Sequence, residues 1–418
     1  MIKIRFRFYG GAREVGRSCI LLEHKGYGVL MDCGIKLNPL SYPRLPDHVD
    51  SMILSHAHLD HSGMVPALYK RDGPPVYATD LTFEISHLLQ RDSMKINKLR
   101  KERSVYSSRE MRRMQGAEVD VTYGVERKLT DEISFKLLDA GHIPGSASIL
   151  LQAGEHRVLY TGDIQTNNSR LLKGATDIPH ADVLLIESTY GDRIHPDRKE
   201  LEKIFLDTVD ETLSRGGTAL VPAFAVGRSQ EMLLILDKID YPVYLDGMSK
   251  TVTSLFLQYS GYLRDAEGLQ EAANRARWVE NNSERKKAVS KPSVIVTTSG
   301  MLTGGPVMQY LHHLHRDEKS SILLTGYQVE GTNGRLLMDE DYVIDPWGNK
   351  KLRVDMMKHQ FDFSAHAGRR SLEKIVKKVD PGIVIVVHGD EDVSLSFAEW
   401  LKESRETYVP SIGDEVRI

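Results

Sequence analysis

The sequence contains little cysteine and no long apolar run. Cys19 and Cys33 are the only cysteines, too few and too badly spaced for a disulfide framework or a thiolate zinc site. No stretch approaches the roughly 18 apolar residues of a membrane helix. The N-terminal residues alternate between apolar and basic types and lack the apolar core of a signal peptide. We therefore expect a cytoplasmic protein with no membrane partner.

Strong charge of either sign is also missing, since the net charge is −3 over 418 residues. The length exceeds that of one usual domain, which predicts two domains or one domain interrupted by another. The charge is uneven, because residues 95–114 hold eight Lys or Arg against two Glu. Such a run is either a solvated helical face or a track for a phosphate backbone, and the sequence leaves both interpretations open.

Strand patterns dominate the first third of the chain, and strands alternate with helices from about residue 183. The later strands include 183–188, 218–224 and 293–300, and the helices include 197–215 and 228–239. Apolar strands alternating with helices predict a mostly parallel sheet covered on both faces. The pattern of the last part of the chain is again similar to that of the first part. This indicates an outer α/β domain with a second α/β unit inserted into it.

The stretch "SHAHLDHSG", residues 55–63, is the strongest chemical signal. It places His56, His58, Asp60 and His61 in six consecutive positions, between the predicted strand 49–54 and a helix predicted to start after Gly63. A loop between a strand and a helix is where a rigid scaffold commonly displays functional groups. We interpret the cluster as part of a metal site.

Three further candidates share that setting, a potential ligand at a strand end beside a glycine. They are His142 in "AGHIPGSA", Asp163 in "TGD" and His388 in "VVHGDE". Each alone is as well explained as a cap or a core-edge residue. Together they complete five histidines and two aspartates, enough for two ions bridged by a carboxylate. Imidazole and carboxylate without thiolate suit zinc, so the set predicts metal-assisted hydrolysis.

The motifs resemble those of a known family. "SHAHLDHSG", "MDCG", "AGHIPGSA" and "TGD" are similar to the signature of the metallo-β-lactamase fold. "IESTYGD", "FDFSAHAG" and "VVHGDE" resemble motifs A, B and C of the β-CASP nucleases. That branch includes RNase J and the endonuclease subunit of the cleavage and polyadenylation specificity factor, and the chain looks like an archaeal-type homologue of that subunit.

The resemblance implies a role for each matching residue. It assigns His56, His58 and His142 to one zinc ion. It assigns Asp60, His61 and His388 to a second, with Asp163 bridging the two. Asp32 would brace the histidine loop without binding metal.

The resemblance also implies catalytic and substrate-binding groups. His366 would donate a proton to the leaving oxygen, and Glu187 would orient it. Asp60 and Asp163 would act at the two ions. Substrate-binding candidates in the remaining motifs are Ser364, Arg228, Ser299 and Gly300; for Ser364 a helix-capping role is an equally good interpretation.

The expected architecture is a metallo-β-lactamase αββα sandwich with an inserted β-CASP α/β domain and the active site in the cleft between them. The expected domains are 1–195 and 348–418 for the sandwich and 196–347 for the insert.

The predicted function is hydrolysis of single-stranded RNA with two zinc ions per chain, by an endonuclease of RNA processing or decay. A 5′-to-3′ exoribonuclease of the RNase J type is the alternative. Hydrolysis of a small thioester or lactam is a weaker alternative, because the chain has the inserted domain and the His388 strand. A non-catalytic RNA-binding subunit is also weaker, because every metal-ligand position is filled. The resemblance further implies a homodimer and membership of an RNA-processing complex.

Overall fold

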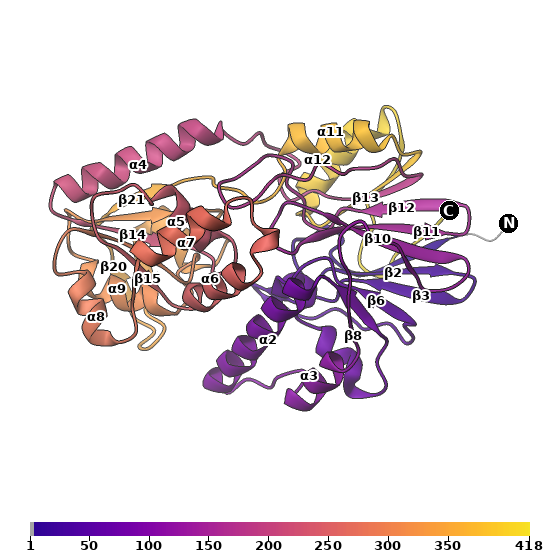
Figure 1. Ribbon diagram of the computed structural model, residues 1–418, viewed down its shortest axis with the longest axis horizontal. Coiled ribbons are helices and arrows are strands. Elements are labelled where there is room, and N and C mark those ends of the chain that lie inside the picture. Colours follow the sequence, from indigo (N-terminus) through magenta and orange to yellow (C-terminus); the bar gives the residue numbers. More distant parts are fainter. Residues whose placement is uncertain (1–3) are drawn as a thin grey trace. The chain divides into compact units, whose positions relative to one another are not determined.

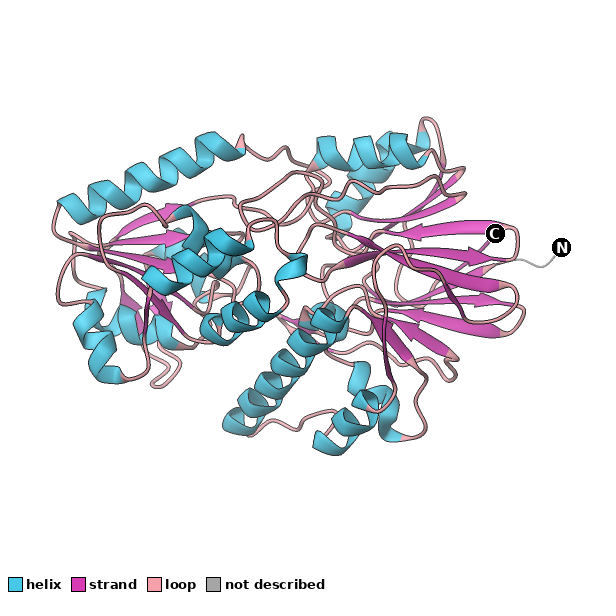
Figure 2. Ribbon diagram, viewed as in Figure 1, coloured by secondary structure: helices cyan, strands magenta, loops and turns pink. Residues whose placement is uncertain are grey.

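The computed structural model describes residues 4–418, and the chain divides into two compact units. Unit 1 comprises Met1–Asn168, Gly174–Ile194 and Ala365–Ile418, apart from residues 1–3, which lie outside the description. Unit 2 comprises Ser169–Lys173 and His195–Ser364. Figures 1 and 2 show the elements of both units. Within the described residues, no helix has both the length and the apolar character needed to cross a membrane.

Unit 1 contains two seven-stranded sheets. The first has the order β24 (Glu415–Arg417), β1 (Arg5–Gly10), β2 (Cys19–His24), β3 (Tyr27–Met31), β6 (Ser51–Ile53), β7 (Val76–Ala78) and β8 (Glu118–Asp120). The second has the order β23 (Glu406–Tyr408), β22 (Ile383–Val387), β13 (Val183–Glu187), β12 (His156–Tyr160), β11 (Ala147–Ala153), β10 (Ile133–Asp139) and β9 (Arg127–Lys128). A short hairpin joins β4 (Lys36–Leu37) to β5 (Leu40–Ser41).

The two sheets pack face to face through apolar side chains, and in β1 these alternate with polar ones. In β1 (RFRFYG) the buried Phe6 and Phe8 alternate with partly exposed arginines. Both rings join one core cluster with Phe135 of β10 and Leu185 of β13, so this cluster lies between the sheets. Period-two alternation of this kind is what a half-buried strand requires.

Helices cover the two outer faces of this sandwich. The first sheet carries α1 (Leu59–Ser62), η1 (Val65–Lys70), α2 (Asp80–Arg100) and α3 (Ser108–Gln115). The second carries α11 (Arg369–Val379) and α12 (Glu391–Lys402). In α11 the buried residues are Leu372, Ile375, Val376 and Val379, the i, i+3, i+4, i+7 spacing of one helix face. Unit 1 is therefore a four-layer αββα sandwich, as expected (Figure 2).

Unit 2 is built on one parallel sheet of six strands. Their order is β16 (Arg277–Trp278), β15 (Val243–Asp246), β17 (Ser293–Thr297), β14 (Thr218–Pro222), β18 (Ser321–Leu324) and β21 (Met357–Gln360). Every pairing in it is parallel, which confirms the prediction from the alternating strands and helices. A separate antiparallel pair joins β19 (Tyr342–Ile344) to β20 (Lys351–Arg353).

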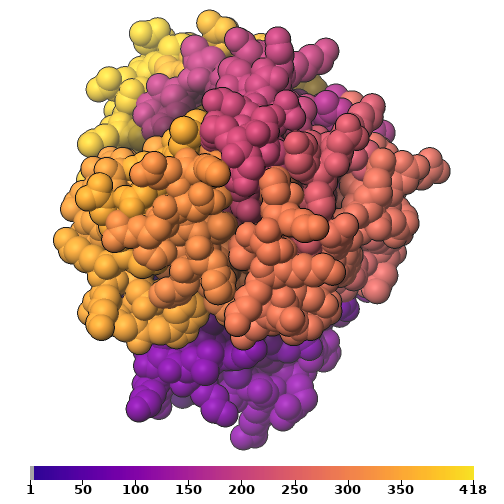
Figure 3. All heavy atoms as spheres, turned by 90° about the vertical axis from the view of Figure 1, so that its left-hand side faces the viewer, coloured from indigo at the N-terminus to yellow at the C-terminus, as the bar shows by residue number. Residues whose placement is uncertain are grey.

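Helices lie on both faces of the unit 2 sheet. They are α4 (Arg198–Ser214), α5 (Arg228–Ile235), α6 (Ser249–Gln258), η2 (Ser260–Tyr262), α7 (Ala266–Arg275), α8 (Asn282–Ala288), α9 (Pro306–Leu314) and α10 (Asn333–Glu340). Residues of α4, α5 and α7 share one core cluster, and residues of α8, α9 and α10 share another. Figure 3 shows one face of unit 2, where the residues coloured orange form most of that unit's visible surface.

Several elements differ in length or type from the sequence prediction. The helix expected after Gly63 is the 3-10 helix η1, and Pro66 lies in its first turn. The strand expected over 49–54 spans only Ser51–Ile53. The insert boundaries of 196–347 stay a prediction; the compact unit extends to Ser364, because β21 pairs with β18 and so belongs to the sheet of unit 2.

Candidate metal centre

Several strands of unit 1 end at a common edge, where the candidate residues gather. β3 and β6 pair in parallel in the first sheet, and β12, β13 and β22 pair in parallel in the second. The carboxyl ends of parallel strands lie at the same edge of a sheet. Asp32 follows β3, the histidine loop follows β6, Asp163 follows β12, Glu187 ends β13 and His388 follows β22.

The histidine loop is held by hydrogen bonds to Asp32. Ser55 donates its backbone N–H to Asp32 Oδ1 at 2.7 Å and its hydroxyl to Asp32 Oδ2 at 2.8 Å. Tyr160 donates its hydroxyl to the same oxygen at 2.8 Å, and His61 Nδ1 lies 2.7 Å from it. Asp32 is fully buried. It therefore braces the loop from behind, with its carboxylate fully engaged.

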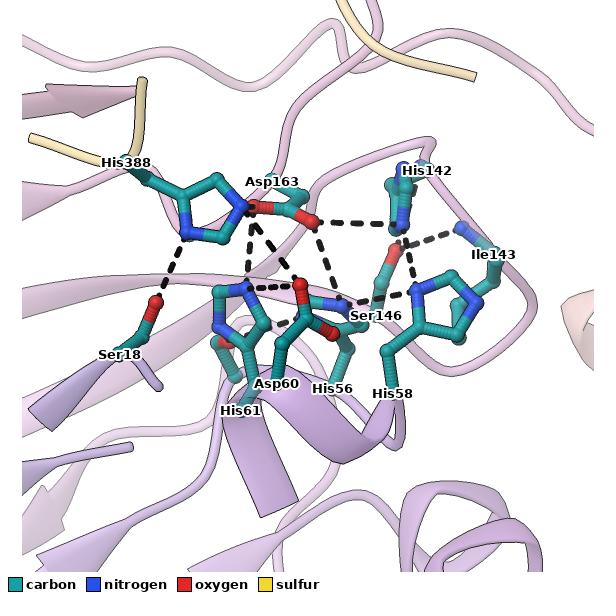
Figure 4. Close-up of polar contacts among 12 residues, drawn as sticks. Ser18, His56, His58, Asp60, His61, His142, Ile143, Ser146, Asp163 and His388 are labelled. Atoms are coloured by element: carbon teal, nitrogen blue, oxygen red, sulfur yellow. Dashed lines mark hydrogen bonds and ion pairs between the residues drawn. The ribbon is translucent and has the colours of Figure 1, made fainter. Parts of the chain in front are cut away.

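One group of ligand atoms surrounds Asp163 Oδ2 (Figure 4). His56 Nε2 lies 3.4 Å and His142 Nε2 lies 3.6 Å from this oxygen. His58 Nδ1 lies 3.2 Å from His56 Nε2 and 3.1 Å from His142 Nε2. The four atoms all lie within 4.8 Å of one another, which is the spacing that one bound ion requires.

A second group surrounds the other oxygen of the same carboxylate. His61 Nε2 lies 3.3 Å and His388 Nε2 lies 3.5 Å from Asp163 Oδ1. Asp60 Oδ2 lies 4.0 Å from His61 Nε2 and 3.8 Å from His388 Nε2. Figure 4 shows Asp163 between the two groups of side chains. Each oxygen of one buried carboxylate thus faces its own set of donors.

In three of the histidines the Nδ1 atom already has a partner behind the site, so the Nε2 atom points toward the other candidate ligands. His61 Nδ1 contacts Asp32, His142 Nδ1 donates to the Ala365 carbonyl at 2.9 Å, and His388 Nδ1 lies 2.8 Å from Ser18 Oγ. Partners of this kind fix the tautomer and the ring orientation of metal-binding histidines.

Three of the inward-pointing atoms are buried without any hydrogen-bond partner, namely His61 Nε2, His388 Nε2 and Asp163 Oδ1. Burying polar atoms in this state costs free energy, so each such atom needs an explanation. All three face one point, and a cation there would satisfy them together. The donor set therefore fits a metal ion.

The protonation states of His56 and His142 agree with this fit. Burial, followed by the charge of a neighbouring histidine, holds the pKa of His56 and of His142 well below the usual range. Neutral imidazole is the form that binds metal. Burial opposes ionisation of Asp163, but His388 and His61 outweigh it and hold its pKa well below the usual range. Asp163 is therefore a carboxylate at neutral pH. Burial opposes the charge of His61, but Asp163 and Asp32 outweigh it and raise the pKa of His61 well above the usual range.

His366 lies beside this cluster and is paired with Glu187. His366 Nδ1 lies 3.0 Å from Glu187 Oε2, and its Nε2 lies 3.9 Å from Asp163 Oδ2. Burial opposes the charge of His366, but Glu187 and Asp163 outweigh it and raise its pKa to about 9. Glu187 is itself fully buried and accepts the backbone N–H of Ile164 at 2.7 Å. The pair resembles a positioned proton donor, although Asp163, Glu187 and His366 also have the spacing of a metal-binding group.

The predicted substrate-binding residues lie in unit 2. Arg228 begins α5, and Ser299 and Gly300 follow β17, so all three lie at the carboxyl edge of its sheet. Ser299 Oγ accepts the Thr303 backbone N–H at 3.1 Å, which ties the loop to itself. Ser364 is the last residue of unit 2.

Sequence reasoning missed the residues that support the histidines from behind. Ser18, Ser55 and Tyr160 donate to or face the site, and Gln165 donates to the His366 carbonyl at 2.7 Å. These residue types are common and carry no motif of their own. The one available signal was position, since Ser55 opens the histidine loop and Tyr160 ends the strand before Asp163.

Comparison with protein-family models matches three parts of the chain. Residues 12–201 match the metallo-beta-lactamase superfamily, and residues 229–337 match the Beta-Casp domain. Residues 351–410 match the Zn-dependent metallo-hydrolase RNA specificity domain. The order of these matches agrees with a sandwich interrupted by an insert.

Named relatives match over nearly the whole chain. The "Probable RNase MJ4" of Methanocaldococcus jannaschii is 40% identical, over 98% of this chain and 99% of its own length. The "Transcription termination factor FttA" of the same organism is 38% identical, over 99% of this chain and 72% of its own length. The "RNase aCSPSF2" of Saccharolobus solfataricus is 35% identical, over 99% of this chain and 85% of its own length.

A solved structure shares the fold. It is a protein of unknown function from Enterococcus faecalis V583, with a TM-score of 0.65 and 16% identity over the full length of both chains. The resemblance drawn from the motifs is confirmed. The chain belongs to the metallo-β-lactamase superfamily, in the branch that carries a β-CASP domain and an RNA specificity domain.

Proposed function

We propose that the protein is a zinc-dependent ribonuclease that hydrolyses phosphodiester bonds of single-stranded RNA. The observation that carries the proposal is the buried Asp163 carboxylate, whose two oxygens face two separate sets of donors. The names of the relatives, which include RNases, support RNA as the substrate. A match to an RNA specificity domain supports it independently.

We assign His56, His58 and His142 to one zinc ion, and Asp60, His61 and His388 to the other, with Asp163 shared. Nitrogen and oxygen donors without thiolate suit zinc at a catalytic site. When bound, two such ions supply Lewis-acid activation of water and of the phosphoryl oxygen. Asp32 holds His61 and the loop in the orientation that this requires.

The remaining chemistry falls to His366 and Glu187. Glu187 engages Nδ1 of His366, which leaves Nε2 as the nitrogen that donates a proton to the leaving oxygen. The 3.9 Å from that Nε2 to Asp163 Oδ2 puts the donor beside the shared carboxylate. Ser364, Arg228, Ser299 and Gly300 are proposed to contact the RNA, through hydroxyl, guanidinium and backbone groups.

Internal cleavage is the proposed mode, and 5′-to-3′ exonuclease action is the alternative. A sealed circular RNA distinguishes the two modes, because it has no 5′ end at which an exonuclease can start. Cutting of the circle supports the proposal. An untouched circle, together with rapid release of mononucleotides from RNA with a 5′ monophosphate, would establish the alternative.

Zinc content separates an enzyme from a non-catalytic RNA-binding subunit. Elemental analysis of the purified chain is expected to give about two ions per chain, the number that a two-metal site holds. Substoichiometric zinc together with RNA binding and no cleavage would favour the subunit. The homodimer, the processing complex and the cytoplasmic location stay predictions from the resemblance; light scattering of the purified chain tests the first of them.

A further inference from the structure

The carboxyl edge of the unit 2 sheet contains a place where ligands commonly bind. β14 continues through α5 to β15 on one side of the sheet, whereas its neighbour β18 continues through α10 toward β21 on the other. Residues of α5 and α10 pack in different core clusters, so the two helices cover opposite faces. Where connections from adjacent parallel strands diverge in this way, a crevice opens outside the strand ends.

Two exposed aromatic side chains follow these two strands. Phe224 follows β14 and is 43% exposed, and Tyr327 follows β18 and is 41% exposed. Single exposed apolar residues are ordinary on a protein surface. Two exposed aromatic residues, one after each of two adjacent strands whose connections diverge, are less ordinary than a single one.

Two glycines lie beside the Phe224 ring. A Cβ atom at Gly300 would lie 3.5 Å from Phe224 Cδ2, and one at Gly326 would lie 3.9 Å from Phe224 Cε2. The ring therefore lies against the glycine backbone that follows β17 and β18, the two strands that flank β14. Gly326 directly precedes Tyr327 in the sequence, so the Phe224 ring lies near the backbone that carries Tyr327.

Tyr327 lines a cavity of about 260 Å³ with Gln328, Arg335, Met338, Asp339 and Gln360. The Gln328 amide is 3% exposed, donates Nε2 to the Gly326 carbonyl at 3.1 Å, and leaves Oε1 without a hydrogen-bond partner. The partly exposed Arg335 shares its charge with Asp339, whose Oδ2 lies 2.6 Å from Nε.

This lining favours a flat ring that carries one adjoining phosphate. Asp339 lies beside the only guanidinium among the lining residues, which disfavours a free multivalent anion. Amides and a phenol ring suit the edge and the face of a nucleobase.

We propose that Phe224 and Tyr327 form a base-stacking site for single-stranded RNA at the carboxyl ends of β14 and β18. The two rings take neighbouring bases, and Arg335 contacts the phosphate between them or beside them. The inference rests on the proposed function, since it supplies the binding of RNA that the ribonuclease requires. Stacking on an aromatic ring is tolerant of sequence and stronger for purines, so the site would favour runs of adenine over runs of uracil.

Binding of short oligoadenylate and oligouridylate to the full-length His366→Ala chain, which is expected to keep its zinc and to cleave slowly, tests the proposal. Phe224→Leu and Tyr327→Leu, made in that background, are each expected to weaken oligoadenylate binding about 5- to 150-fold and to abolish the preference for adenine. Phe224→Tyr and Tyr327→Phe keep a ring and should bind as the parent does. Trp347→Leu is the matched control, because Trp347 is 61% exposed on the turn between β19 and β20.

Unchanged binding by both leucine variants would overturn the proposal. An equal loss for both homopolymers would overturn it as well, because that pattern indicates a general effect on the fold. Thermal melting of each variant checks the fold directly.

A second measurement needs no variant. Photo-crosslinking of RNA that contains 4-thiouridine is expected to label the peptides that contain Phe224 or Tyr327, and labelling confined to other peptides would contradict the site. Failure of the proposed function looks different, since the wild-type chain would then neither bind nor cleave any RNA. A chain that cleaves RNA while both leucine variants bind normally refutes the stacking site alone.

Discussion

The two units treat a buried aspartate in opposite ways. In unit 2, Asp246 is 1% exposed, and both of its oxygens are occupied. Arg285 Nε donates to Oδ2 at 2.7 Å, the Tyr310 hydroxyl donates to the same oxygen at 2.9 Å, and the Gly247 N–H donates to Oδ1 at 2.7 Å. In unit 1, Asp163 is 2% exposed, and its Oδ1 has no hydrogen-bond partner.

The contrast separates structural charge from functional charge. A buried carboxylate with a bidentate arginine and two further donors is balanced by the protein itself. Asp163 Oδ1, by contrast, faces two histidine nitrogens that have no hydrogen-bond partner, His61 Nε2 and His388 Nε2, which is the arrangement that a bound cation would complete. Among residues 4–418, all four groups with metal-ligand spacing lie in unit 1. The four predictions below test this division, from the largest expected effect to the smallest.

Loss of the shared carboxylate is expected to have the largest effect. Asp163→Asn should lower the rate of RNA cleavage by more than about 10⁴-fold, the upper end of what loss of a single proton donor costs. Bound zinc should fall with it, because both donor sets lose one oxygen. Asp139→Asn is the matched control, since Asp139 ends β10 and is exposed. Wild-type cleavage by the Asp163 variant would refute the site.

Removal of the proton donor is expected to have the next effect. His366→Ala should lower the cleavage rate about 10²–10⁴-fold and keep the zinc content of the parent, because a general acid contributes to the rate and not to metal binding. Glu187→Gln should show a smaller loss, since the ring stays in place. Zinc lost in step with activity would instead make His366 a ligand.

Loss of the buried aspartate of unit 2 should lower the stability of the fold without changing metal binding. Asp246→Ala leaves Arg285 and Tyr310 without their partner and is expected to lower the free energy of unfolding by about 3–5 kcal/mol. Chemical denaturation measures this loss. The zinc content of the folded fraction should equal that of the parent, and a fall in it would break the division between the units.

The smallest of the four effects is expected behind the metal site. Asp32→Asn replaces a carboxylate that engages Ser55, His61 and Tyr160, so zinc affinity should fall about 10–100-fold. Competition with a chelator measures the affinity. Tyr160→Phe removes one of these donors and should weaken zinc binding less; equal affinity of the Asp32 variant and the parent would show that the histidine loop needs no brace.

Local patterns along the chain were enough to find much of the site. His56, His58, Asp60 and His61 lie within six residues, so one loop reveals them. The parallel sheet of unit 2 was also predictable, because apolar strands alternating with helices have few other ways to bury their side chains. His142, Asp163 and His388 were predicted as a set, because each is a potential ligand at a strand end beside a glycine, whereas the ion that each would bind came from the resemblance.

Only the tertiary structure decided which atoms meet. Asp163 and His388 are separated by 225 positions in the sequence, yet Asp163 Oδ1 and His388 Nε2 lie 3.5 Å apart because β12, β13 and β22 run in parallel. The extent of unit 2 to Ser364 was not visible in the sequence for the same reason, since β21 joins unit 2 through pairing with β18. The point between β14 and β18 where the connections diverge likewise depends on strand order. A sequence records which residues follow one another, whereas strand order and register determine which side chains share an edge, and both are set by long-range packing.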